Sequence, residues 1–425
     1  MPQRQCSIVK TEAAKPSKRI CLPISRETYA AMIDEQQCFR ETLDSFIDSC
    51  PELFPAEIKQ GYHLYGFARQ SVKMPAVKIR RISLPTEQGR IAIYNIVPSF
   101  VMPYRVGYAE DVEKALFLRR FGAAFWALTY VFGRNDLYWQ RLVAQLGRNH
   151  IVGTPLKDAD DLPAHLLVDE KHTRLNGEKA YLATTVADNC ILGASLTLQA
   201  DEVHLREAYA HFKVEAQRLS ADYQPQTVNT DGWSPTQLAW QALLPTITII
   251  LCFLHAFLSM RSRAKHLKAT FASISQRVWQ VYHAQNVETF KERIADPQAW
   301  AKAHVTGPSL EAILKLCSKA DCFALAFDYS DAYRTSNMLD RQLDALDRCL
   351  YAAHSFHGHL MSAEYQVRAW PLFHNFQPYC PRAKIRQHDQ SPFHQLNGFV
   401  YLDNCLQNLL LAASLAGRYA TNAIR

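Results

Sequence analysis

Short apolar segments rich in β-branched residues, separated by polar turn residues, recur between residues 164 and 253. The first three follow one another closely, and Asn176-Gly177 separates the first from the second. This dipeptide favours the positive φ angles of a two-residue hairpin turn. The pattern predicts an antiparallel meander with strands at 164–169, 179–186 and 190–198.

A helical period follows the third strand. Within 201–220, apolar residues recur at intervals of three and four positions, which places them in one stripe along a helix. A fourth strand is expected at 226–230, and Ser234 with Gln237 then resembles a capping box that opens a second helix. A buried strand at 246–253 comes last. The apolar stripe of the first helix consists of Leu205, Tyr209, Phe212, Ala216 and Leu219.

The N-terminal part of the chain mixes helical and strand patterns. Residues 1–24 are basic and have no period, so we expect a flexible arm. Helices are expected at 26–50 and at about 56–68, with prolines between them. Two β-rich segments at 77–84 and 90–97 predict a hairpin.

Residues 110–149 predict a compact unit of three helices. Gly122 marks a break or a close contact after the first helix, and Asn135 or Asp136 caps the third. Short turns and several arginines suit a helix-turn-helix that reads DNA, but a three-helix bundle with a solvated basic face has the same pattern. The predicted helices are 111–121, 125–132 and a third that ends at Gly147.

The C-terminal part is predicted to be helical. Residues 261–335 are aromatic and basic, and an amphipathic helix follows on which Asp340 lies beside the buried face. Residues 366–420 indicate two more helices around a proline-rich, basic crossover at 371–386. The buried face of the amphipathic helix consists of Leu339, Leu343, Leu346, Leu350 and Ala353.

Composition narrows the class of protein. Of the 425 residues, 48% are hydrophobic and 20% are charged, which supports a sizeable core in two or three domains. A net charge of +7 allows nucleic-acid binding. The eleven cysteines are scattered without a Cys-x-x-Cys pair, so we expect free thiols in a reducing cytoplasm. With 15 glycines and no P-loop or dinucleotide pattern, no nucleotide cofactor is expected.

Two segments bear on membrane attachment. The first twenty residues are polar and basic, unlike a signal peptide. Residues 243–260 are apolar, but Pro245, Thr248 and His255 interrupt them, and the run is shorter than a membrane span needs. We therefore expect a helix end that leads into a buried strand, and no membrane partner.

Two aspartates lie at the ends of predicted strands. Asp169 ends the first strand and Asp231 ends the fourth, 62 positions later (231 − 169). Carboxylates at the ends of neighbouring strands can hold divalent cations for phosphodiester chemistry. Glu170, the next residue, would point to the opposite face of its strand.

The order of strands and helices, with aspartates on the first and fourth strands, resembles the ribonuclease-H-like fold of polynucleotidyl transferases. Asp231-Gly232, followed 21 positions later (252 − 231) by Cys252-x-x-His255, narrows the resemblance. It is similar to Mutator-like transposases and the related bacterial insertion-sequence transposases. The resemblance covers roughly residues 160–350.

That family carries a third acid in a Thr-Thr-Asn-x-x-Glu-Arg motif. The matching stretch here runs from Thr335 to Arg341 and has Asp340 in place of the glutamate, 109 positions after Asp231 (340 − 231). The alternative is Glu364, at 133 positions (364 − 231), which has the usual residue type but no matching flanks. We prefer Asp340 because of its flanking residues.

The resemblance implies an α/β fold with a ribonuclease-H-like mixed-sheet core and a helical insertion, preceded by a mostly helical N-terminal DNA-binding region with a β-hairpin. The expected parts are a flexible basic arm at 1–24, the DNA-binding region at 25–155 with its hairpin at 76–97 and the helix-turn-helix-like unit at 110–149, the first part of the core at 160–260, the insertion at 261–335, and the last catalytic helix with the C-terminal helices at 336–425.

The implied activity is that of a DDE-type DNA transposase, which cleaves the ends of a mobile element and joins them to target DNA. Asp169, Asp231 and Asp340 would hold two Mg²⁺ ions, for which Mn²⁺ can substitute. The implied partners are double-stranded DNA, as terminal inverted repeats and as target, and further copies of the chain. The implied location is the cytoplasm of a bacterium, at the nucleoid.

The roles expected of the residues around the acids are less specific. Cys252, His255 and Asn337 are expected to pack and to position the ligands, because two residues cannot close a zinc site. Trp233 either stacks on a base or sugar or caps the core. Arg341 either clamps a phosphate or forms a surface ion pair. Phosphate contacts from the N-terminal region are expected from Lys78, Arg80, Arg81, Arg141 and Arg148.

Two other functions stay open. Aspartate in place of the usual glutamate shortens the third ligand by one methylene, which allows a DNA-binding protein that descends from a transposase but has lost catalysis. A ribonuclease-H-like nuclease that only hydrolyses is the other. Short inverted repeats around the coding region, in several genomic copies, would favour the transposase.

Overall fold

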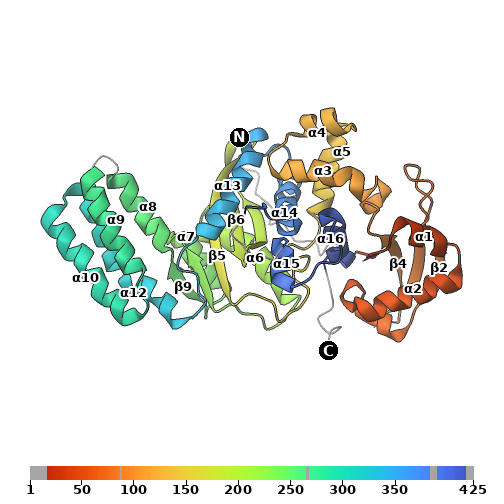
Figure 1. Ribbon diagram of the computed structural model, residues 1–425, viewed down its shortest axis with the longest axis horizontal. Helices are drawn as coiled ribbons and strands as arrows, with labels where there is room; N and C mark the ends of the chain where they lie inside the picture. Colours follow the sequence, from red (N-terminus) through yellow and green to blue (C-terminus); the bar gives the residue numbers. More distant parts are fainter. Residues whose placement is uncertain (1–16, 87–88, 265–267, 383–389, 418–425) are drawn as a thin grey trace, which may run out of the picture.

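The computed structural model describes residues 17–86, 89–264, 268–382 and 390–417. The molecule is elongated, with a central sheet, a helical arm at one end and a smaller sheet with short helices at the other (Figure 1). The ten cysteines among the described residues are free, as expected. Within these residues, no helix has the length and apolar character needed to cross a membrane.

The central sheet is mixed, and its strands stand in the order β7-β6-β5-β8-β9. The first three form the predicted antiparallel meander, and Asn176 and Gly177 take positive φ angles of 53° and 87° in the hairpin turn. The next two run parallel to the first. The strands are β5 (His165–Leu175), β6 (Glu178–Ala187), β7 (Cys190–Thr197), β8 (Thr227–Thr230) and β9 (Thr248–Leu251).

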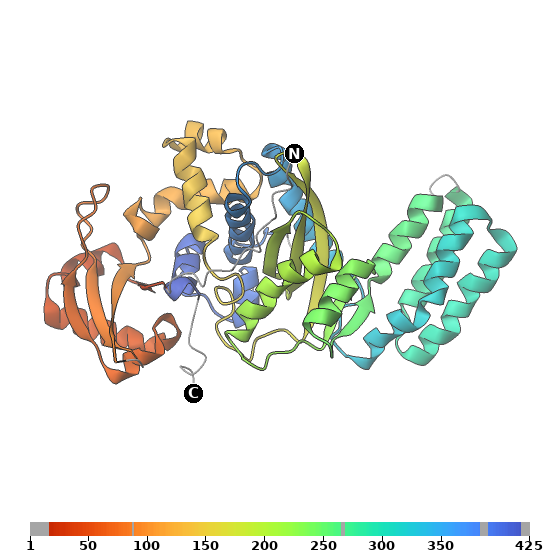
Figure 2. The ribbon, with the colours of Figure 1, turned by 180° about the vertical axis from the view of Figure 1, so that it is seen from behind.

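Helices cover both faces of this sheet. The apolar stripe predicted for α6 (Glu202–Gln217) is buried, together with α7 (Ser234–Leu243), on one face (Figure 2). On the other face lie α13 (Asn337–Ala352), with its predicted leucine stripe buried, and α14 (Leu360–Phe376). Successive residues of β5 alternate between the faces, as a pleated strand requires: Leu166 packs towards α6, Leu167 towards α13.

Helix α14 also covers the edge strand β7. Asn375 accepts a hydrogen bond from Ile191 N at 2.9 Å and donates one to Ile191 O at 2.8 Å. An open edge would expose unpaired backbone groups to other chains. Because α14 runs to Phe376, Pro371 lies inside this helix and not in the crossover where it was expected.

The helical arm has a hydrophobic core of its own. It begins at Phe253, eight residues before the predicted 261, because β9 ends early and Cys252 N donates to Thr230 O at 2.7 Å as the chain turns into a helix. The predicted strand at 246–253 is correspondingly shorter. The arm contains α8 (Phe253–Ala264), α9 (Lys268–Tyr282), α10 (Val287–His304), α11 (Gly307–Ser318), α12 (Ala320–Ala324) and η4 (Leu325–Asp328).

The N-terminal sheet has four strands in the order β1-β4-β3-β2. The predicted hairpin is present, but the prediction for the segment before it is wrong in part. The segment 19–22 is a buried strand parallel to β4, not part of a flexible arm; residues 1–16 lie outside the described residues. The strands are β1 (Arg19–Leu22), β2 (His63–Phe67), β3 (Arg80–Pro85) and β4 (Ile91–Pro98).

Helices in this region are shorter than predicted. The expected helix at 26–50 is broken where Glu35 caps a new helix through Gln37 N and Cys38 N. The expected helix at 56–68 is a short helical turn and the edge strand β2, with Gly61 at φ 93° between them. The elements are α1 (Arg26–Met32), α2 (Gln36–Ser49), η1 (Pro51–Leu53) and η2 (Ala56–Gln60).

The three helices predicted within 110–149 are all present, after the turn η3 (Pro103–Arg105). Asn135 caps the third by accepting from Tyr138 N at 2.8 Å. Gly122 has φ 93°, and a Cβ there would lie 2.8 Å from Arg348 O on α13, so both the break and the close contact are real. The helices are α3 (Ala109–Arg120), α4 (Phe125–Phe132) and α5 (Asp136–Leu146).

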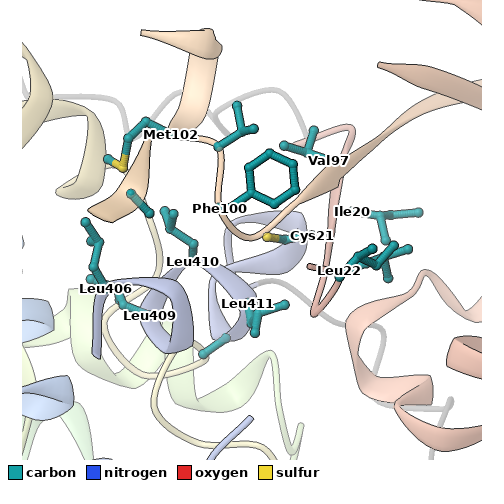
Figure 3. Packing of buried hydrophobic residues seen from close by; sticks show 14 of the residues in the cluster. Ile20, Cys21, Leu22, Val97, Phe100, Met102, Leu406, Leu409, Leu410 and Leu411 are labelled. Atoms are coloured by element: carbon teal, nitrogen blue, oxygen red, sulfur yellow. The ribbon is translucent and has the colours of Figure 1, made fainter. Parts of the chain in front are cut away.

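The C-terminal helices pack against the N-terminal region. One core contains residues of β1, α3 and α5 together with α14 and α16 (Figure 3), where Leu409, Leu410 and Leu411 lie near Cys21 and Phe100. The N-terminal region and the C-terminal helices therefore share one core. The last elements are α15 (Pro392–Asn397), α16 (Cys405–Ala412) and η5 (Ser414–Ala416).

Candidate metal centre

Asp169 and Asp231 lie on adjacent strands of the central sheet. The prediction that Asp169 ends its strand is wrong, because β5 stays paired with β6 as far as Leu175, whereas Asp231 directly follows the end of β8. The parallel ladder pairs His165 with Thr227 and Leu167 with Asn229, an offset of 62 positions (227 − 165). Asp169 and Asp231 are separated by the same 62 positions. Continued two residues past the last pair, Leu167 with Asn229, this register places the two aspartates on adjacent strands at one level and on the same face of the sheet as Leu167, which packs towards α13.

A third acid and a histidine reach the same place. One ligand atom each of Asp169, His255 and Asp340 lie within 4.8 Å of one another, the one such group of potential ligands among the described residues. Asp340 lies in the first turn of α13 and His255 in the first turn of α8. His255, expected to position other groups, is therefore itself placed as a ligand. Asp231 is next to this group but does not belong to it.

Cys252 and Ser336 tie these elements together. Ser336 N donates to Cys252 Sγ at 3.2 Å, and Ser336 Oγ donates to Asp340 Oδ2 at 3.2 Å. The same hydroxyl lies 3.2 Å from His255 Nδ1. The end of β9, the start of α8 and the start of α13 thus share one buried hydroxyl, which fixes the histidine and the third acid relative to each other.

In the part of the chain that the structure describes, no arginine or lysine forms an ion pair with Asp169, Asp231 or Asp340. Burial raises the pKa of Asp169 to about 6, and the carboxylates of Asp231 and Asp340 add to the shift, while His255 opposes it. Burial also raises the pKa of Asp340. Contact with Cys252, followed by the charges of the two carboxylates, raises the pKa of His255 to about 9. Such a cluster favours binding of a further cation.

Glu170 points away from the centre, as the strand alternation predicted. Its Oε1 accepts hydrogen bonds from Tyr209 and Thr236, each at 2.7 Å, on the α6 and α7 side of the sheet. Burial raises the pKa of Glu170 to about 7. This carboxyl group is held by the fold and is not a candidate ligand.

Glu364, the alternative third acid, lies elsewhere. Its Oε2 accepts from Leu196 N at 2.7 Å and its Oε1 from Ser195 Oγ at 2.8 Å. It therefore helps α14 to cover the edge strand β7. The geometry favours Asp340 over Glu364, because only Asp340 approaches Asp169.

The turn after β8 depends on Asp231 and Gly232. Asp231 Oδ1 accepts from Trp233 N at 2.8 Å, and Gly232 takes φ 92°. Trp233, not Ser234, is the N-cap of α7, so the predicted capping box is wrong. Trp233 is half-buried against the α6 core, and its ring lies 6.4 Å from those of His172 and Tyr181.

Lys319 is a residue that the sequence did not point to. It lies between α11 and α12, yet its Nζ is 3.7 Å from the position of a Cβ on Gly232. In the part of the chain that the structure describes, no carboxylate lies within ion-pair distance of this Nζ. The arm therefore places an ammonium group beside the Asp231 turn. Nothing in the local sequence distinguishes Lys319 from the other lysines of the chain.

Two other residues near the third acid are exposed at the start of α13: Asn337, and Arg341, whose Nε donates to Asn337 O at 3.3 Å. Arg341 forms no ion pair among the described residues. Both are open to a ligand from solvent.

The five predicted DNA-contacting residues divide into two groups. Arg80 is buried, donates to Ile33 O and lies over the rings of Phe39 and Phe67, so its expected phosphate contact is wrong. The sequence did not reveal that Phe39 of α2 and the backbone of Ile33 cover Arg80. The others reach the surface: Lys78 pairs with Asp34, Arg81 lies over Tyr65, Arg148 lies over Tyr365, and Arg141 is exposed.

The donor set fits a divalent cation. Two carboxylates and an imidazole converge from β5, α13 and α8, and ligand atoms around such an ion lie roughly 3–4.5 Å apart. A scan of the chain against protein-family models finds no matching family, and a search of curated proteins finds no match.

Proposed function

We propose that this chain is a DDE-type DNA transposase with a ribonuclease-H-like core, which cuts and joins DNA at the centre formed by Asp169, Asp231 and Asp340. The observation that carries the proposal is the shared offset of 62 positions, which brings Asp169 of β5 beside Asp231 at the end of β8, while Asp340 reaches Asp169 from α13. The sheet order, with the meander followed by two parallel strands, supports it.

Phosphodiester cleavage requires an activated water and neutralisation of charge on the phosphate oxygens and the leaving group; divalent ions supply both when bound. Asp169, Asp340 and Asp231, with His255, would hold two such ions. Lys319, beside the Asp231 turn, and the exposed Arg341, one residue after Asp340, would bind phosphates near the scissile bond. Ser336 keeps Asp340 and His255 in place through hydrogen bonds.

Binding of the DNA duplex would use the exposed cations of the N-terminal region. Lys78, Arg81, Arg141 and Arg148 remain candidates, and each phosphate contact would add about one unit to the slope of log affinity against log salt. Because the N-terminal region shares its core with α14 and α16, binding has to be measured with the full chain and not with a fragment.

The test is cleavage of labelled duplex DNA that carries the sequences flanking the coding region, with MgCl₂, MnCl₂ or EDTA. Wild type should cut at the element ends and join the 3′ ends to a target plasmid. Asp169→Asn and Asp231→Asn should abolish cutting and leave DNA binding nearly unchanged. Asp340→Ala should do the same, while Glu364→Ala should retain cutting if it folds.

Asp222→Asn is a suitable control, because Asp222 is an exposed acid in the loop before β8. Cutting without joining would indicate the nuclease that only hydrolyses. Specific binding without any cutting by wild type would indicate the inactive descendant. Cutting at the wild-type rate by Asp169→Asn would refute the metal centre.

A further inference from the structure

His255 has the position of a metal ligand rather than of a residue that only supports one. Its ligand atom lies within 4.8 Å of those of Asp169 and Asp340. The side chain is half-buried and comes from the first turn of α8, directly after the strand β9. Asp231 is outside this group of three.

The hydrogen bonds of the ring are those of a ligand. His255 Nδ1 lies 3.2 Å from Ser336 Oγ, which donates in turn to Asp340 Oδ2. With Nδ1 protonated and donating to Ser336, Nε2 keeps its lone pair for a cation. Histidines that bind metals commonly donate their other ring nitrogen to such a partner, which fixes the tautomer and the ring orientation.

We propose that His255 is a direct ligand of the first divalent cation, together with Asp169 and Asp340, and that the centre therefore prefers a transition-metal ion to Mg²⁺. Magnesium favours oxygen ligands, whereas imidazole favours the transition metals, and affinity for an N/O site rises from Mn²⁺ along the first row. Mn²⁺ is the probe, because it binds both donor types and is paramagnetic.

This inference concerns the metal centre on which the proposed function rests, but its test needs no DNA. Titration of the full chain with MnCl₂, followed by electron paramagnetic resonance, gives the affinity and number of bound ions. Pulsed measurements on the bound ion then detect ¹⁴N coupling from a coordinated imidazole. Competition with MgCl₂ gives the selectivity.

We expect one tight Mn²⁺ ion with ¹⁴N coupling, and Mn²⁺ binding at least about tenfold tighter than Mg²⁺. His255→Gln should remove the coupling and most of the preference for Mn²⁺. His172→Gln is the matched control, because His172 is exposed on β5 three residues after Asp169 and contacts Tyr181. It should keep both. Asp231→Asn should weaken the first ion less than Asp340→Asn.

Affinity alone does not separate the two roles, because loss of a supporting residue also costs about 10–100-fold in metal affinity. The nitrogen coupling does. If His255→Gln fails to fold, wild type grown with ¹⁵N-histidine should replace the ¹⁴N signal by a ¹⁵N signal. Bound Mn²⁺ without nitrogen coupling would overturn the ligand role and leave the metal centre intact. Absence of Mn²⁺ binding would overturn both this inference and the metal-dependent part of the proposed function.

Discussion

The junction between α6 and α14 and the candidate metal centre both bury carboxylates against the central sheet. At the junction, Glu215 binds Arg368 at 2.5 Å and accepts hydrogen bonds from Ile151 N and Val152 N. Burial would raise its pKa, but Arg368 and these contacts outweigh burial and hold the pKa at about 2. At the metal centre, burial instead raises the pKa of Asp169 to about 6.

The two pKa values differ because the junction contains a cationic side chain, Arg368, that pairs with its carboxylate. Arg368 also donates from Nε to Gly147 O and from Nη2 to Asn149 O, so the charge of Glu215 is met by a side chain that the backbone holds in place. Among the described residues, Asp169 and Asp340 have the imidazole of His255 beside them and form no ion pair with an arginine or lysine. A buried charge that the chain neutralises holds the fold together, whereas a cluster left short of positive charge is suited to bind an external cation.

The largest effect is expected at the junction. Arg368→Met would leave the buried Glu215 without its counter-charge and should cost about 3–5 kcal/mol of unfolding free energy. Urea unfolding followed by circular dichroism measures it. Arg341→Met, at an exposed arginine of α13, is the control and should change stability by less than about 0.5 kcal/mol. Equal effects of the two variants would contradict the contrast drawn between the two regions.

The junction should also make stability depend on acid pH. Because the folded pKa of Glu215 is lowered to about 2 from an ordinary 4.5, its contribution is complete above pH 4.5. It is lost as pH falls from 4.5 towards 2, and the loss amounts to roughly 3 kcal/mol. Unfolding free energies measured across this range should fall for wild type. The double variant Glu215→Gln, Arg368→Met should lose less over the same interval.

Lys319 offers a test of what a single cation does at the edge of the metal centre. Lys319→Gln should slow DNA cleavage about tenfold, which corresponds to about 1.4 kcal/mol, because one phosphate contact is lost. Folding and Mn²⁺ binding should stay unchanged. Lys315→Gln, at an exposed lysine one turn earlier on α11, should cut like wild type. Equal slowing by both variants would mean a general charge effect.

The smallest effect is expected on the unfolding free energy of the metal-free chain when one acid of the metal centre is removed. Asp340→Asn should stabilise the metal-free chain by on the order of 1 kcal/mol, because it relieves the burial of like charges. Excess MnCl₂ should raise the melting temperature of wild type and leave that of the variant nearly unchanged. A destabilised variant without metal would show that Asp340 serves mainly to hold Ser336.

Local patterns in the sequence determined most of the secondary structure. The hairpin at Asn176-Gly177, the stripe on α6, the cap at Asn135 and the leucine face of α13 are all visible in the chain, because each depends on neighbours within a few positions. The predicted strand ends point to Asp169 and Asp231 in the same way, although β5 in fact continues past Asp169, whereas Asp340 is indicated by the resemblance of its flanking residues to a family motif.

Only the tertiary structure decided which of these residues meet. The ladder offset that aligns Asp169 with Asp231, and the arrival of His255 at Asp340, depend on pairing between distant segments. Arg80 was expected to contact phosphate, but it is buried against Phe39 of α2. Strand β1 has too little local pattern to reveal its partner β4. The position of Lys319 beside Gly232 also depends on tertiary structure, because the helical arm brings it there. Contacts between distant segments leave no period in the sequence, so their outcome is set by packing.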